Sequence, residues 1–84
     1  MRPEEILPDN VNQAEIKGVV VRKGSVGAFL ANARILADPA ASAEDRAIAE
    51  RDIVAMVPAL RALGLFDVLS IRDDKLRVLV ERHL

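Results

Sequence analysis

An 84-residue chain without cysteine makes a single small domain, residues 1–84, and excludes both disulfide bonds and thiolate metal sites. Apolar residues form 51% of the chain, which excludes disorder, while only Phe29 and Phe66 are aromatic, so the core must be aliphatic. Twelve basic and thirteen acidic residues give a net charge of −1, without the basic surplus that nucleic-acid binding requires.

The first twelve residues predict an irregular N-terminal arm. They carry two prolines, and Pro8-Asp9-Asn10 is a sequence typical of turns. The start of the chain does not resemble a signal peptide, and no apolar run is long enough to span a bilayer. We therefore expect a cytoplasmic protein with no membrane partner.

Residues 13–23, QAEIKGVVVRK, form the most strand-like segment, because three consecutive valines are β-branched. Gly18 interrupts the segment and indicates either a tight turn at Lys17-Gly18 or a bulge in one strand. We favour a short hairpin, which must pack on helices or pair with another strand because two strands alone are marginal in water.

Residues 25–37, SVGAFLANARILA, predict a helix that is apolar on two opposite sides. Only Asn32 and Arg34 bring polar side chains into its interior, so we expect this helix to be covered on both sides at the centre of the fold. Ser25 is expected to cap its start. Asp38-Pro39 should end it, because the residue before a proline is pushed out of the helical region.

A second helix is expected after Ser42, which with Asp45 approximates a capping box. Pro58 lies inside its pattern and should either kink the helix or begin a second short one, which Gly64 ends. Residues 65–71 fit a strand or a helical turn, and Asp73 or Asp74 can cap a last helix. The fold class is α+β, a short N-terminal hairpin packed on three helices; a purely helical bundle is the alternative.

Two stretches carry a family resemblance: the hairpin-like segment that runs through Gly24-Ser25-Val26 into an apolar helix, and Gly64-Leu65-Phe66-Asp67 after Leu60. Together they resemble a group of small bacterial proteins with the same order of hairpin, capped helix, second helix and Gly-Leu-Phe-Asp. The chain departs from that pattern in its added C-terminal segment from about Arg72. The group has no established activity, so the resemblance supports the architecture and implies no functional residues.

Arg22, Lys23 and Ser25 are the candidate ligand-binding residues. Two bases beside a helix N-terminus are suited to a phosphate or carboxylate, since free amides and the helix dipole both point there. The simpler interpretation, which we favour, is that the bases face water and Ser25 only caps, because the glycine spacing of a phosphate loop is missing.

Three titratable residues are candidates for chemistry. Asp52 falls inside an apolar arc of the second helix. It could be a buried carboxylate that pairs with Arg34 or acts with a raised pKa. The simpler account is that Pro58 shifts the helical phase, so that Asp52 does not share a face with the apolar residues after the proline. Asp67 more simply caps or turns the chain, and His83 is expected to be exposed at the end of the last helix. No residue set predicts a metal site or a cofactor.

The leading hypothesis is a small interaction domain without catalysis that associates with itself or with another protein, because its apolar content exceeds what one small core hides. The alternative is a binding module for a small anionic metabolite at Arg22–Ser25. An enzyme acting through Asp52 or Asp67 ranks third, for want of a base–nucleophile pair. DNA binding through the second helix is disfavoured, because its acidic first turn would face phosphates.

Overall fold

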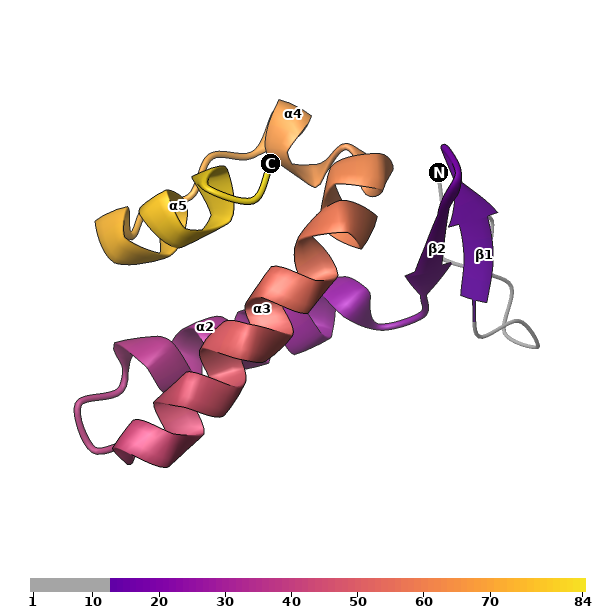
Figure 1. Cartoon of the computed structure of the whole chain (residues 1–84). Helices are drawn as coiled ribbons and strands as arrows, with labels where there is room; N and C mark the ends of the chain where they lie inside the picture. Colours follow the sequence, from indigo (N-terminus) through magenta and orange to yellow (C-terminus); the bar gives the residue numbers. More distant parts are fainter. Residues whose placement is uncertain (1–12) are drawn as a thin grey trace.

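The computed structural model describes residues 13–84, and the predicted arm, residues 1–12, lies outside them. Figure 1 shows a hairpin at one end of a mostly helical molecule. In chain order the elements are β1 (Gln13–Ile16), β2 (Val19–Arg22), α2 (Ser25–Ala37), α3 (Ala43–Leu63), α4 (Leu65–Val68) and α5 (Asp74–Glu81). The predicted α+β class with a hairpin packed on helices is confirmed, and the helical-bundle alternative is wrong.

The hairpin turns at Lys17 and Gly18, as predicted. Both residues have positive φ, 50° and 79°, which is the pattern of a two-residue turn whose twist matches that of the strands. The antiparallel register pairs Ala14 with Val21, and Val21 is fully buried. The alternate side chains, including Val20, are exposed, so the hairpin packs on α3 through one face only.

The start of α2 differs from the prediction. Gly24, with a φ of 85°, occupies the N-cap position, and Ser25 is already the first helical residue. The Ser25 hydroxyl donates to the Arg22 carbonyl oxygen at 2.6 Å and does not cap the helix. A glycine in the left-handed region turns the chain sharply enough to start the helix one residue early. The helix ends at Asp38, before Pro39, as expected.

The centre of the fold is α3 and not α2, which corrects the main expectation from the sequence. This 21-residue helix packs against the hairpin, α2, α4 and α5, and it runs diagonally through the middle of the molecule in Figure 1. In α2 only Phe29 is buried, while Leu30 is 56% exposed. Because α3 is about 31 Å long at 1.5 Å per residue, it alone can reach every other element.

The ends of α3 are those that the sequence predicted. The Ser42 hydroxyl accepts a hydrogen bond from the Asp45 N–H at 3.0 Å, and Gly64 ends the helix with a φ of 82°. The helix is continuous through Pro58, so the second short helix is not formed. A proline inside a helix costs about 3 kcal/mol, and the residues near it, Val57 and Leu60, are completely buried.

The core is mainly aliphatic, with one pair of phenylalanines, and it brings together α2, α3, α4 and α5. Its buried members are Phe29 from α2, Val80 from α5, and Ile53, Val57 and Leu60 from α3. Phe29 also meets Phe66 of α4 edge to face, with ring centroids 6.1 Å apart. Aromatic pairs of this geometry add about 0.5–1.5 kcal/mol beyond their buried area. The contact between the two phenylalanines therefore packs the α4 turn against the core.

The segment after Gly64 is helical and not a strand. Leu65–Val68 forms a single turn, and the described part of the chain contains one sheet of two strands. The following helix, α5, begins as predicted, with the Asp73 carboxylate accepting from the Leu76 N–H at 2.9 Å. Leu84 lies beyond its end and is exposed.

Candidate functional site

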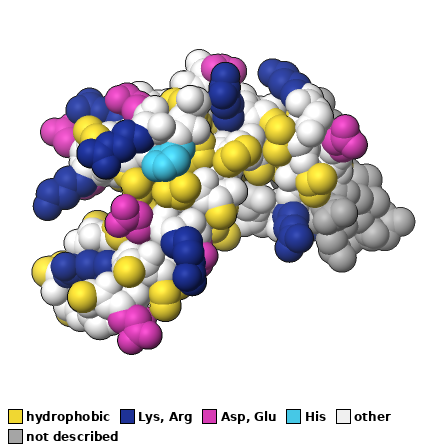
Figure 2. Space-filling model, in the orientation of Figure 1, with side chains coloured by type: hydrophobic (Ala, Val, Ile, Leu, Met, Phe, Trp, Pro, Cys, Tyr) yellow, Lys and Arg dark blue, Asp and Glu magenta, His cyan; other side chains and the backbone are white. Residues whose placement is uncertain are grey.

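A groove of 1450 Å³ lies between α2 and the segment that leads into and through α5. Figure 2 shows this hollow between two lobes, with apolar side chains along its sides and both basic and acidic side chains near its rim. Each wall is a helical stripe of spacing i, i+3, i+4, i+7. The α2 wall carries Gly27, Leu30, Ala31 and Arg34, and the α5 wall carries Lys75, Val78, Leu79 and Arg82. We call this hollow the basic groove.

Both acidic and basic side chains line the basic groove, but they differ in whether they form an ion pair or a helix cap. Asp74 pairs with Arg77 at 3.1 Å, and the Asp73 carboxylate caps α5. Within residues 13–84, Arg34, Lys75 and Arg82 form no ion pair; Arg72, also a lining residue, forms none either. Glu50 is the remaining acid on the lining. Among the described residues the lining therefore carries four bases and three acids, and the four bases and Glu50 are the groups without an ion pair or a cap.

A second, shallower hollow of 340 Å³ lies on the other side of α5, between that helix and α4. Its lining contains three of the exposed large apolar side chains, Val68, Leu69 and Leu84. Its charged members are Asp67, Arg77 and Glu81, and Arg77 lies 4.0 Å from Glu81. This hollow has no basic surplus.

The predicted anion-binding residues lie at the strand-to-helix turn, away from both hollows. Arg22 and Lys23 are exposed, and Ser25 is half-buried with its hydroxyl donating to the Arg22 carbonyl oxygen. Neither hollow is lined by any of the three. The structure supplies no concave pocket at this turn among the hollows described, and anion binding there stays a prediction.

The other residues singled out by the sequence are dispersed. Asp52 is half-buried at the edge of the α3 apolar arc, and the Arg34–Asp52 ion pair is not formed in the described part of the chain. Because α3 is continuous through Pro58, the helix has no break that would place Asp52 on a different face from the apolar residues after the proline. Asp67 is exposed next to the turn at Gly64, and His83 is exposed, with its Nδ1 2.9 Å from the Leu79 carbonyl oxygen.

Sequence reasoning missed the basic groove, although half of its signal was present. The stripe Lys75, Val78, Leu79, Arg82 can be read from helical spacing alone, but its position opposite α2 cannot. On α3 the charged side chains Glu44, Glu50, Arg51 and Arg61 are all exposed.

Among residues 13–84 no three histidine, aspartate or glutamate side chains are placed to hold a metal ion. Over the same residues no helix is both long and apolar enough to cross a membrane, and the cytoplasmic location stays a prediction. Comparison of the chain with protein-family models, curated proteins and solved structures gives no match, so the resemblance to small bacterial proteins also stays a prediction.

Proposed function

We propose that the protein is a small interaction domain without catalysis, which associates with further copies of itself. The observation that carries the proposal is the incomplete cover of α2. This helix is apolar on two sides, but α3 covers only one part of its circumference. Leu30 remains 56% exposed on the groove side, and Ile35 remains 37% exposed on another side.

Apolar side chains in this arrangement favour association. A single exposed leucine is ordinary on a protein surface, but apolar residues that gather along one groove are typical of contact surfaces. Leu30 and Val78 line opposite walls of the basic groove, and both are exposed. Burying one such side chain in a contact with another copy is worth about 1.5–3 kcal/mol.

The test is the mass in solution, measured by light scattering on a sizing column across a tenfold range of protein concentration. We expect a mass above the 9.2 kDa of one chain that rises with concentration. Leu30→Glu should lower it toward one chain, because a charge at that site cannot be buried in the contact without a large cost.

The matched control is Lys17→Glu, in the exposed hairpin turn away from both hollows. This variant should keep the mass of the unmodified protein. A mass of 9.2 kDa at every concentration would show that the chain does not self-associate and would overturn the proposal.

A further inference from the structure

We infer that the basic groove of one copy receives an acidic face on α3 of another copy, so that the copies join head to tail. The inference rests on the proposed self-association and identifies the two surfaces that meet. The acidic face is defined by Glu44, Asp45, Ile48 and Asp52.

The acidic face is centred on Ile48, which is 42% exposed. At 100° per residue, Glu44 and Asp52 lie about 40° to either side of Ile48, and Asp45 and Arg51 lie about 60° to either side. Glu44, Asp45 and Arg51 are exposed and Asp52 is half-buried. None of the three acids forms an ion pair within residues 13–84. The face is therefore an exposed apolar side chain surrounded by a surplus of negative charge.

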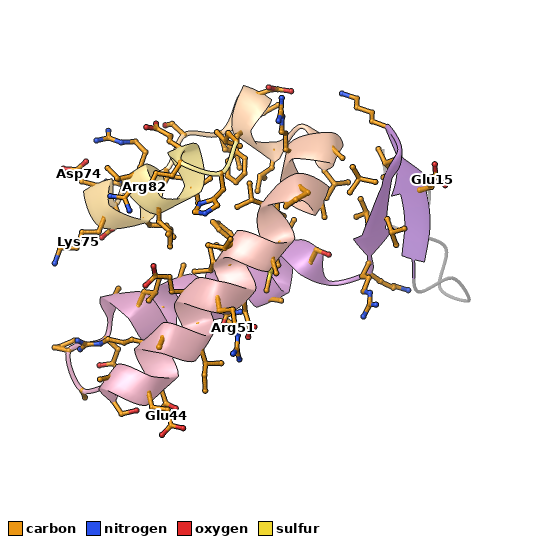
Figure 3. The ribbon with its side chains drawn as sticks, in the orientation of Figure 1. Glu15, Glu44, Arg51, Asp74, Lys75 and Arg82 are labelled. Atoms are coloured by element: carbon orange, nitrogen blue, oxygen red, sulfur yellow. The ribbon has the colours of Figure 1, made fainter. Side chains whose placement is uncertain are left out.

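Charge complementarity selects this face as the occupant of the groove. The groove offers Arg34, Lys75 and Arg82 as unpaired bases around the apolar Leu30 and Val78. In the docked pair, Ile48 packs against the two apolar side chains, and the acids lie near the bases. Figure 3 shows Lys75 and Arg82 projecting from α5, and Glu44 from the first turn of α3. A groove docked on a second groove would instead bring bases against bases.

The lengths of the two surfaces agree with this pairing. The acidic face, from Glu44 to Asp52, covers about two and a half turns of α3. The α5 wall of the groove, from Lys75 to Arg82, covers about two turns.

The two surfaces lie on different sides of the molecule. Glu50, which lines the groove, and Ile48 are separated by about 160° around α3. A copy that offers its acidic face to one neighbour still has its own groove open for another. The contact is therefore heterologous, and the association continues beyond two copies as a chain or a closed ring.

The experiment is a charge swap with rescue. In one variant the groove is reversed, Lys75→Glu with Arg82→Glu, and in the other the acidic face is reversed, Glu44→Lys with Asp45→Lys. Each variant alone should associate at least about tenfold more weakly than the unmodified chain, because like charges then face each other. An equimolar mixture should recover the mass of the unmodified chain, because each reversed surface meets its opposite.

The control is Lys17→Glu with Arg61→Glu, which makes the same change of charge as the groove variant at exposed positions outside both surfaces. It should associate as the unmodified chain does. Far-ultraviolet circular dichroism confirms the fold of every variant, and recovery in the mixture cannot come from unfolded protein.

The outcomes separate the two proposals. If the unmodified chain stays at 9.2 kDa, self-association itself fails and this docking mode fails with it. If the unmodified chain associates and both reversed variants associate equally well, self-association stands and the docking mode is wrong. Loss in both variants without recovery in the mixture also overturns the pairing of these two surfaces.

Discussion

The hydroxyl of Ser42 and that of Ser25 have different roles, although both serines stand at the start of a helix. Ser42 accepts from the Asp45 N–H at 3.0 Å and so satisfies one amide that the first turn of α3 leaves open. Ser25 donates to the Arg22 carbonyl oxygen, at the end of β2, and caps nothing. The difference arises from Gly24, which takes the N-cap position of α2.

At the residue scale we predict that Ser42→Ala lowers the free energy of unfolding by about 1 kcal/mol, the usual value of an N-cap. Ser25→Ala should change it by less than about 0.5 kcal/mol, because no helix amide depends on that hydroxyl. Urea denaturation followed by circular dichroism measures both. An equal loss for the two variants would contradict the assignment of Gly24 as the cap.

At the scale of elements, the two long helices differ in how much of each is covered. Three residues of α3, Ile53, Val57 and Leu60, are completely buried, whereas α2 buries Phe29 alone. The hairpin, α2, α4 and α5 each pack on α3. The stability of the fold therefore depends on the buried side of α3 more than on the apolar sides of α2.

We predict that Leu60→Ala lowers the free energy of unfolding by about 2–5 kcal/mol, because it leaves a cavity under the packed elements. The same change at Leu30, which is exposed, should lower it by less than about 1 kcal/mol. Both values are measured at low protein concentration, where association contributes least. If Leu30→Ala were the more damaging change, α2 and not α3 would be the central helix.

For the molecule as a whole, α5 closes the core from the far end of the sequence. Val80 is 1% exposed and belongs to the same cluster as Phe29, although the two residues are 51 positions apart in the sequence. Val78, two residues earlier, is 43% exposed and lines the basic groove. One side of α5 thus packs in the core, and another side forms a wall of the groove.

Val80→Ala should destabilise the entire domain by about 1.5–3 kcal/mol, because it removes buried methyl groups from a core shared by several elements. Val78→Ala should change the free energy of unfolding by less than about 0.5 kcal/mol. For each variant, thermal unfolding should give a single transition, and circular dichroism and calorimetry should report the same midpoint for it. Separate melting of α5 in Val80→Ala would show that this helix is not part of the common core.

Local features of this protein were determined by the sequence alone. The turn at Lys17-Gly18, the end of α2 before Pro39, the cap at Ser42, the end of α3 at Gly64 and the cap at Asp73 were all predicted and are all present. Each depends on backbone preferences or on one hydrogen bond between residues no more than four positions apart, which a sequence displays directly.

The tertiary structure decided the rest. Both α2 and α3 have apolar sides, and only the packing of distant segments shows that α3 is the covered helix and that α2 keeps Leu30 exposed. Residues 65–68 form a helical turn in which Phe66 packs on Phe29, a contact between residues 37 positions apart. The basic groove likewise joins α2 to a helix some forty residues later, and no local preference encodes such a meeting of two walls.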